Sequence, residues 1–277
     1  MKNIIFQYMI TNGLDKRRSP KGWTGSRDEL YKKSSILSWD SFNKYAKAVG
    51  ATHHFTKSRV FTSGCGHDTH LYLFEVLRII YDELFDDFDN VLYVDSDVIC
   101  NTRENIFNLV DGTFEMAGIY ESDIMTGRGI CGYNSWDKRP DKRDALKRKL
   151  DRVKIPMIPT SPPARPSCFG MFNTGVMLWT KEGRHKAREK FDDWFEFYKD
   201  GVDHADPFWL NNDQPFISGQ IAKHGIKTRL LDQKWNDSPS HYDFYEQWEN
   251  QNFLHYTGGF GKVDMLDHYS VNLFKYI

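Results

Sequence analysis

Cysteine and long apolar runs are both scarce in this 277-residue sequence. Its four cysteines form no C-x-x-C pair and no zinc-ligand spacing, because they lie far apart at Cys65, Cys100, Cys131 and Cys168. No segment approaches the roughly 20 consecutive apolar residues of a membrane-spanning helix. The apolar stretch at the amino terminus is too short for a signal peptide. We therefore expect a cytoplasmic protein with no membrane span.

An excess of one charge sign is also missing. The 37 lysines and arginines balance 38 aspartates and glutamates, for a formal net charge of −1. This balance disfavours a strongly basic nucleic-acid-binding protein, so we expect no nucleic-acid partner. The sequence has no G-x-x-x-x-G-K-[ST] motif, no G-x-G-x-x-G after a strand and no G-x-S-x-G motif. Phosphate-loop, dinucleotide-binding and serine-hydrolase functions therefore lack support.

Aromatic residues, by contrast, are abundant and make up 15% of the chain. They disfavour disorder and offer stacking surfaces for a ring-shaped ligand. No internal repeat is visible and no linker divides the chain, so we expect a single domain that spans residues 1–277.

Apolar patterning predicts alternating strands and helices. Short apolar runs predict strands at residues 3–11, 53–55, 90–94, 115–119, 171–179 and 227–231, with a last apolar stretch from 253. Apolar residues at helical spacing predict helices at 27–49, 69–85, 180–199 and 213–224. This alternation predicts an α/β fold, with a mixed, mostly parallel sheet flanked by helices on both faces.

The segment 121–170 breaks this alternation. It is proline-rich and without apolar periodicity, apart from a charged stretch at 137–153 that fits a helix. A long irregular segment inside a compact domain is typically functional, so we expect a lid or a substrate-binding loop there.

Two carboxylates follow a strand that is predicted to be buried on both faces. Asp95 and Asp97, separated by Ser96, come directly after residues 90–94, and the apolar run then resumes at Val98. Burying two carboxylates is costly unless a cation or hydrogen-bond donors accompany them. Paired carboxylates are ligands for divalent cations, and ligands bind at the carboxyl ends of strands in α/β sheets. A solvated surface turn is the alternative.

Four segments resemble, in order, the motifs of the glycogenin-like family of retaining glycosyltransferases (family 8), which have the GT-A fold. Asp95-Ser96-Asp97 resembles the D-x-D element, and residues 172–177 (FNTGVM) resemble F-N-x-G-V-M. Asp213-Gln214 resembles the D-Q pair, and residues 255–262 (HYTGGFGK) resemble the H-x-x-G-x-x-K element. The sequence departs from the family by one additional residue before Lys262 and by the long 121–170 segment.

The resemblance implies one GT-A domain in three parts. These are a nucleotide-binding part at about 1–120, an acceptor-side insertion at about 121–170 and a catalytic remainder at 171–277.

The resemblance also implies a metal site and a diphosphate site. Asp95, Asp97 and His255 would bind a divalent cation, which neutralises charge on the departing diphosphate. The imidazole favours Mn²⁺ over Mg²⁺. Gly258 would allow close backbone approach to the diphosphate and Lys262 would add a positive charge, with Ser96 also among the donor-binding residues. For His255, packing in the aromatic-rich carboxyl-terminal region is the alternative.

Three further residues would act on the sugar. Asp213 would bind donor hydroxyls, Gln214 would face the anomeric carbon, and Asn173 would bind the sugar hydroxyls or the acceptor. Alternatives are an N-cap role for Asp213, unless Asn211 or Asn212 takes it, and a bulge or turn at Asn173.

The nucleotide would be bound at the end of the first strand. By the same resemblance, Tyr8, Ile10 and Thr11 would receive the uracil base, and Arg78 would contact the diphosphate or the donor sugar. A core tyrosine and a helix-surface arginine are the alternatives.

The sequence thus predicts a metal-dependent glycosyltransferase. It would move a sugar from a nucleotide-diphosphate donor, a UDP-sugar, to a hydroxyl acceptor such as a glycan, with retention of configuration. One rival is an inverting GT-A glycosyltransferase with Asp213 as the base. Another is a non-catalytic protein of the same fold that binds sugar nucleotides or glycans. The sequence does not predict an oligomeric state.

Overall fold

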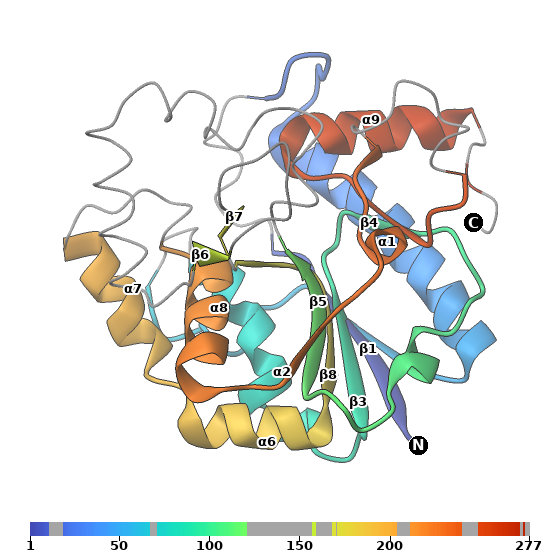
Figure 1. Ribbon diagram of the computed structural model, residues 1–277. Coiled ribbons are helices and arrows are strands. Elements are labelled where there is room, and N and C mark those ends of the chain that lie inside the picture. Colours follow the sequence, from blue (N-terminus) through green and yellow to red (C-terminus); the bar gives the residue numbers. More distant parts are fainter. Residues whose placement is uncertain are drawn as a thin grey trace.

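The computed structural model describes residues 1–10, 19–66, 71–120, 157–158, 168–169, 171–203, 211–239, 249–271 and 274. These residues form a layered α/β fold in which helices cover both faces of a central sheet (Figure 1). The predicted fold class is therefore confirmed. Thr11, the predicted helix at 137–153 and nearly all of the segment 121–170 lie outside the described residues.

The central sheet has six strands in the order β2-β1-β3-β8-β5-β9. In that order the strands are Thr52–Thr56, Asn3–Tyr8, Asn90–Val94, Phe172–Thr180, Met116–Tyr120 and Thr228–Leu230. Strand β8 runs antiparallel to both of its neighbours, and the other pairs are parallel, so the prediction of a mostly parallel sheet is confirmed. Two small antiparallel sheets pair β4 (Val98–Cys100) with β10 (Phe253–His255), and β6 (Met157–Ile158) with β7 (Cys168–Phe169).

Both faces of the central sheet are buried, because successive side chains of a strand point to opposite sides. In β3, Val91 and Tyr93 join one hydrophobic core, and Leu92 and Val94 join the other. Trp179 of β8 is fully buried on the Tyr93 side. Burying a large apolar side chain contributes about 1.5–3 kcal/mol, so these strands hold the centre of the fold firmly.

Helices on each side complete the two cores (Figure 1). On the Leu92 side lies α1 (Arg27–Val49), against which α9 (Gly258–Ser270) packs. The Tyr93 side is covered by η2 (Leu71–Leu77), α2 (Arg78–Tyr81), α6 (Lys181–Lys190), α7 (Trp194–Asp203) and α8 (Asp213–His224). Short 3-10 turns are η3 (Glu83–Phe85), η4 (Ile106–Leu109) and η6 (Gln233–Trp235).

Helix α1 has the predicted bounds because both of its ends are capped. The Ser26 hydroxyl accepts a hydrogen bond from the Glu29 amide at 3.0 Å, and Gly50 ends the helix in the left-handed conformation with φ 70°. Helix α8 also has its predicted bounds and ends at a left-handed glycine, Gly225.

Two predicted helices are interrupted by aspartates that start a new turn. The helix predicted at 69–85 is a 3-10 helix followed by α2, and it stops at Asp82, whose side chain accepts from the Leu84 amide. The helix predicted at 180–199 divides into α6 and α7, because Phe191 is extended and the Asp193 carboxylate accepts from the Phe195 amide at 2.7 Å. A local cap therefore overrides continuous apolar spacing in both places.

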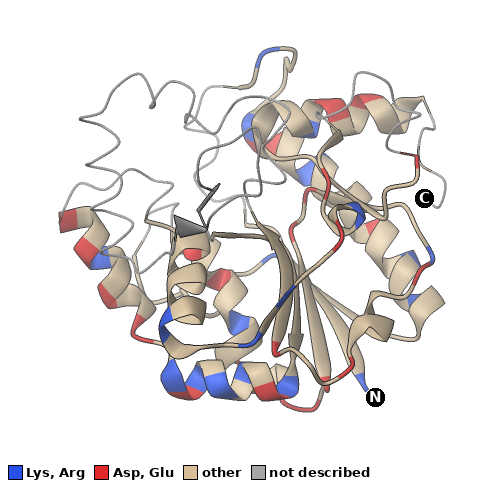
Figure 2. Ribbon diagram, viewed as in Figure 1, with Lys and Arg blue, Asp and Glu red and all other residues tan. Residues whose placement is uncertain are grey.

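Basic residues are concentrated along helix α6, at the end of the fold opposite the carboxyl end of β3 (Figure 2). These side chains are engaged in holding the helix. Arg188 pairs with Asp86 at 2.7 Å, Lys186 pairs with Glu115 at 2.9 Å, and Arg184 donates to the Phe85 carbonyl at 2.9 Å. Arg184, Lys186 and Arg188 thus hold α6 against neighbouring segments.

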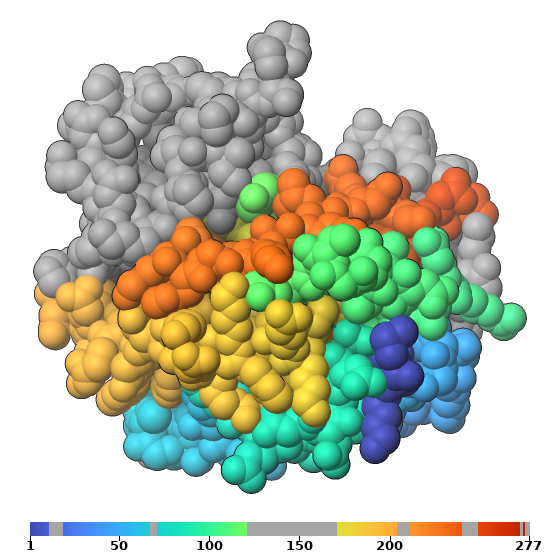
Figure 3. Space-filling model, turned by 60° about the horizontal axis from the view of Figure 1, so that its bottom comes forward, coloured from blue at the N-terminus to red at the C-terminus, as the bar shows by residue number. Residues whose placement is uncertain are grey.

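The segment around β9 crosses the molecule beside the segment around η4 (Figure 3). Arg229 of β9 donates to the Leu109 carbonyl at 2.8 Å and also pairs with Asp111, which fixes the edge of the sheet. None of the described helices combines the length and the apolar character that a membrane crossing requires.

Candidate metal and sugar-donor site

The pairing of β4 with β10 brings the predicted metal ligands together. Asp95 and Asp97 follow β3, and His255 is the last residue of β10, which pairs with β4 directly after the two aspartates. The Tyr256 amide donates to the Asp97 carbonyl at 2.9 Å, and the Asp95 amide donates to the Gly175 carbonyl at 2.8 Å. Main-chain hydrogen bonds therefore hold the three side chains at the carboxyl end of β3.

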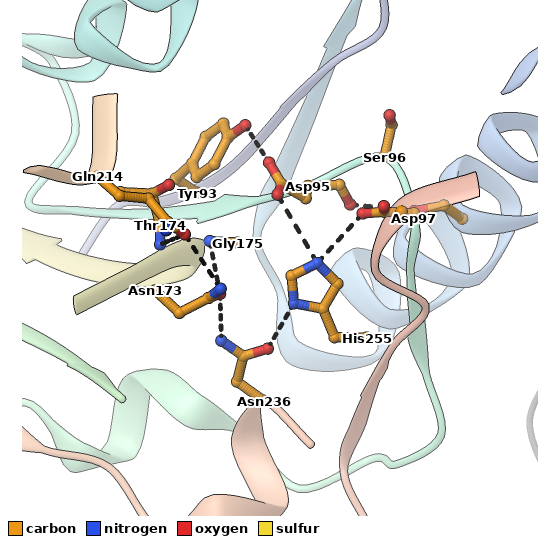
Figure 4. A network of polar contacts seen from close by, with 12 residues as sticks. Tyr93, Asp95, Ser96, Asp97, Asn173, Thr174, Gly175, Gln214, Asn236 and His255 are labelled. Atoms are coloured by element: carbon orange, nitrogen blue, oxygen red, sulfur yellow. Dashed lines mark hydrogen bonds and ion pairs between the residues drawn. The ribbon is translucent and has the colours of Figure 1, made fainter. Parts of the chain in front are cut away.

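The three side chains converge on one point (Figure 4). The His255 Nε2 atom lies 3.3 Å from Asp97 Oδ1 and 3.8 Å from Asp95 Oδ2. One ligand atom from each residue lies within 4.8 Å of the others. Two carboxylates and an imidazole form a donor set suited to Mn²⁺, so the residues present fit a divalent transition metal.

Burial and charge work against each other in this cluster. Burial raises the pKa of Asp95, and the negative charge of Asp97 raises it further. Burial also acts to raise the pKa of Asp97, but the positive charges of Lys262 and His255 outweigh it and hold that pKa well below its usual range. Burial acts to lower the pKa of His255, but the Asp97 charge outweighs it, so the pKa is raised. The positive charges that face the two carboxylates in this cluster come from His255 and Lys262.

Lys262 lies inside this cluster, on the first turns of α9. Its ammonium donates to Asp97 Oδ2 and stands 4.4 Å from the centroid of the Tyr31 ring. Its pKa is raised although burial opposes this, because Asp97 favours the charged form. The described contact of Lys262 is thus with a metal-ligand candidate, and its predicted contact with the diphosphate stays a prediction.

The three glycines that follow His255 meet different structural requirements. Gly258 starts α9 with φ 69°, a conformation that favours glycine, and a Cβ there would meet nothing within 4 Å. A Cβ on Gly261 would lie 2.6 Å from the Tyr256 carbonyl carbon, and one on Gly259 would lie 2.6 Å from Pro20. Gly259 and Gly261 therefore allow close packing of α9, a helix that the sequence did not predict because glycine is a poor helix former.

Asp213 does not cap α8, because the neighbouring Asn212 is the N-cap of this helix. The Asn212 side chain accepts from the Gln214 amide at 3.0 Å. Asp213 Oδ2 instead accepts from the Thr174 hydroxyl at 2.6 Å. Burial raises the pKa of Asp213 to about 7, with a further contribution from the charge of Asp95 and opposition from the Thr174 hydrogen bond. Near pH 7, Asp213 is consequently present in both its protonated and its ionised form beside the cluster.

Asn173 and Gln214 face one another. Asn173 Nδ2 donates to Gln214 Oε1 at 3.1 Å, and the Thr174 amide donates to the same oxygen at 3.2 Å. The pairing of β5 and β8 shifts register beside Asn173, since Tyr120 pairs with Phe172 whereas Gly118 pairs with Met177. Asn173 therefore lies at a strand irregularity, as its alternative interpretation predicted, and also contacts the predicted catalytic amide.

The residues predicted to bind the nucleotide lie at the end of β1 and beside it. The Tyr8 hydroxyl donates to the Leu73 carbonyl at 3.0 Å, and burial, Asp213 and Asp95 raise the Tyr8 pKa well above its usual range. Ile10 is buried. The Ser96 hydroxyl contacts Met9 Sδ at 3.3 Å. The influence of Asp213 and Asp95 places Tyr8 near these carboxylates, and its contact with uracil stays a prediction.

The described contacts of Arg78 do not include the candidate metal ligands. Its Nη2 pairs with Asp82 at 2.7 Å, and its guanidinium carbon lies 5.3 Å from the centroid of the Phe6 ring. The side chain is buried rather than spread over a helix surface. Its contact with the donor stays a prediction from the resemblance.

Two residues at the site were not singled out from the sequence. Tyr93 donates from its hydroxyl to Asp95 Oδ1 at 2.6 Å, and Asn236 Oδ1 lies 2.9 Å from His255 Nδ1. Tyr93 lies in β3, two residues before Asp95, so period-2 alternation continued one residue past the strand could have found it. Asn236 comes from a distant loop, and no local pattern marks it.

The sequence matches no family model and no curated protein. Among solved structures, a glycosyltransferase involved in the glycosylation of the major capsid of PBCV-1 aligns with a TM-score of 0.52 at 14% identity, over 96% of this chain and 99% of that one. The galactosyltransferase LgtC, in complex with donor and acceptor sugar analogs, gives 0.45 at 13% identity, over 97% and 95%. Mouse xyloside xylosyltransferase 1 gives 0.44 at 11% identity, over 92% and 97%. The first of these alignments shows the fold, and the chain accordingly has the GT-A fold that its sequence predicts.

Proposed function

We propose that this protein is a metal-dependent glycosyltransferase, which moves a sugar from a nucleotide-diphosphate donor to a hydroxyl acceptor. One observation carries the proposal. Asp95, Asp97 and His255 converge at the carboxyl end of β3, where α/β sheets bind ligands, and the buried acid Asp213 stands close enough to respond to the charge of Asp95. Metal ligands and a separate polar pair are what a sugar-nucleotide transferase requires.

The two carboxylates and the Nε2 atom of His255 would hold the cation. Imidazole favours Mn²⁺ over Mg²⁺. When bound, the cation neutralises charge that develops on the leaving diphosphate. Lys262 supplies a further positive charge at the same place, and the first amides of α9, next to Gly258, lack partners within their helix. The diphosphate of a donor, for which a UDP-sugar is our candidate, fits this positive surround.

Asp213 and Gln214 would act on the sugar and its reacting carbon. Because burial raises the Asp213 pKa to about 7, this carboxyl group is about half protonated at pH 7. Its Oδ2 atom already accepts a hydrogen bond from the Thr174 hydroxyl at 2.6 Å, which favours binding of donor hydroxyls over proton removal from an acceptor. Asp95 and Asp97 face His255 and Lys262 instead. We therefore propose same-face attack with retention, in which the leaving diphosphate takes the acceptor proton.

The rival functions predict different products. An inverting transferase with Asp213 as the base would reverse the anomeric configuration. A non-catalytic sugar-nucleotide-binding protein would bind the donor without releasing the nucleoside diphosphate.

The test is release of UDP from a panel of UDP-sugars, with Mn²⁺ or with EDTA. We expect release with Mn²⁺ and at least one donor, and loss of that release with EDTA and in Asp97→Ala. Asp87→Ala removes an exposed carboxylate ten positions earlier and should keep full activity. Full activity of Asp97→Ala would overturn the metal assignment, and donor binding without UDP release would favour the non-catalytic rival.

A further inference from the structure

A chain of buried side-chain amides connects the Gln214 side chain to the His255 imidazole (Figure 4). Asn173 Nδ2 donates to Gln214 Oε1 at 3.1 Å, and Asn236 Nδ2 donates to Asn173 Oδ1 at 2.9 Å. Asn236 Oδ1 then lies 2.9 Å from His255 Nδ1. Asn236 itself is fully buried.

The main chain of β8 fixes the orientation of these amides. A backbone N–H can only donate, so the side-chain atom that faces it must be an oxygen. The Gly175 amide lies 2.9 Å from Asn173 Oδ1, and the Thr174 amide lies 3.2 Å from Gln214 Oε1. Exchanging oxygen and nitrogen in either side chain would set two donors against each other, so both orientations are determined.

The same logic then passes to Asn236 and His255. Because Asn173 Oδ1 is an acceptor, Asn236 must present its NH₂ group to it. Asn236 therefore presents its oxygen to His255, and His255 Nδ1 must carry a hydrogen. The other ring nitrogen, Nε2, is the one that faces Asp95 and Asp97.

We propose that Asn236 is a positioning residue, which holds His255 with a hydrogen on Nδ1 so that Nε2 is directed at the metal site. This inference rests on the proposed metal-dependent function. A second partner that fixes the ring and its tautomer is a general requirement of histidine ligands, and losing it typically lowers metal affinity 10- to 100-fold. Asn236 meets that requirement from a different segment of the chain.

The loop that carries Asn236 is itself fixed to β10. The His255 amide donates to the Asp237 carbonyl at 2.7 Å, and the Asp237 amide donates to the Phe253 carbonyl at 3.1 Å. Trp235, on the other side of Asn236, is buried with its ring 5.1 Å from that of Phe253. The backbone position of Asn236 therefore does not depend on its side chain, which makes substitution a test of the amide.

Two substitutions separate positioning from a structural role. Asn236→Leu keeps the branched shape of the side chain but has no acceptor for Nδ1–H. Asn236→Asp keeps an acceptor, and both variants lose the hydrogen bond to Asn173. We would measure Mn²⁺ affinity of the full chain by isothermal titration calorimetry, with circular dichroism to confirm folding. Should Asn236→Leu fail to fold, Asn236→Ala, which lacks the acceptor and is smaller, takes its place.

We expect the Asp variant to bind Mn²⁺ within a few-fold of the unchanged protein and the Leu variant to bind about 10- to 100-fold more weakly. Equal weakening in both variants would show that only the contact with Asn173 matters, and unchanged affinity in Asn236→Leu would show that the amide is dispensable. Either result overturns the inference and leaves the proposed function standing. Absence of Mn²⁺ binding by the unchanged protein, in contrast, would overturn both.

Discussion

Gly175 lies directly against the imidazole of His255. A Cβ atom at position 175 would come within 2.2 Å of His255 Cε1 and within 2.8 Å of its Nδ1. No side chain fits at that distance. The glycine at position 175 is therefore what allows the imidazole to reach the carboxylates. The glycine of the F-N-T-G segment thus has a packing reason, which is specific to the site.

Gly175→Ala should therefore disturb the metal site more than the fold. The added methyl group requires the His255 ring to move away from Asp95 and Asp97, and we expect Mn²⁺ affinity to fall by about tenfold or more. Gly64→Ala is the matched control, since a Cβ there meets nothing within 4 Å. Titration calorimetry on both variants measures the effect. Equal Mn²⁺ affinity in the two would contradict this account of Gly175.

The Asp213 carboxyl should make stability depend on pH. Its pKa is raised from 3.8 to about 7 by burial, so the folded protein retains a proton that the unfolded chain loses. This contribution is fully present below about pH 4, and the free energy of unfolding falls as the pH rises toward 7. The loss amounts to at most about 4 kcal/mol, because each pKa unit is worth about 1.4 kcal/mol.

Asp213→Asn removes that ionisation and keeps an acceptor for the Thr174 hydroxyl. In EDTA, the variant should be more stable than the unchanged protein at pH 8, and the difference should shrink toward pH 5. Urea unfolding at the two pH values measures the difference. A constant difference between pH 5 and pH 8 would be inconsistent with a raised Asp213 pKa.

The sequence predicts the sheet and the two carboxylates of the candidate metal site because both depend on local features, whereas His255 was predicted from the family resemblance. Residues 91–94 are apolar without interruption, and Asp95 and Asp97 stand at the end of that run, so their placement follows from strand geometry alone. Asn236 could not be predicted in the same way. Its function arises from contact with His255 across the small β4–β10 sheet and the loop after η6, and no spacing in the sequence encodes that contact.

The predicted helices show the same division. Apolar spacing found α1 and α8, whose caps coincide with the ends of their patterns. It failed at Asp82 and Asp193, because a single carboxylate there captures a backbone amide and starts a new turn. It also missed α9, where packing against α1 outweighs the low helix propensity of three glycines.

The fully buried carboxylate of Glu75 should be a strong determinant of stability. It accepts hydrogen bonds from the amides of Val60 and Thr62 and from the Thr62 hydroxyl, at 2.7 to 3.2 Å. Glu75→Gln replaces one acceptor oxygen by a donor, which then faces other donors. We expect a loss of about 1–3 kcal/mol, measured by urea unfolding. Glu83→Gln, at an exposed position, is the control, and equal stability of the two variants would refute the role of Glu75.

Retention of configuration is the most far-reaching consequence of the proposed mechanism. Gln214 Oε1 is held by Asn173 and by the Thr174 amide, so its amide group has one orientation beside Asp213. An amide cannot serve as a general base, and the Asp213 carboxyl is engaged by the Thr174 hydroxyl, so in the proposed mechanism the departing diphosphate oxygen takes the acceptor proton. That oxygen lies on the face from which the sugar bond breaks. The acceptor must therefore attack on the same face, which gives retention.

Gln214→Ala should then lower kcat strongly and leave donor affinity almost unchanged, because a group that acts mainly in the transition state contributes little to ground-state binding. Gln220→Ala is the control on the same helix. It removes the 3.0 Å hydrogen bond from Gln220 to Asp192, which does not involve the cluster, and should leave kcat nearly intact. The configuration of the product follows from its anomeric proton coupling in NMR. An α-linked product from an α-linked donor is expected. A β-linked product would refute retention and make Asp213, whose pKa of about 7 suits a general base, the base of an inverting reaction.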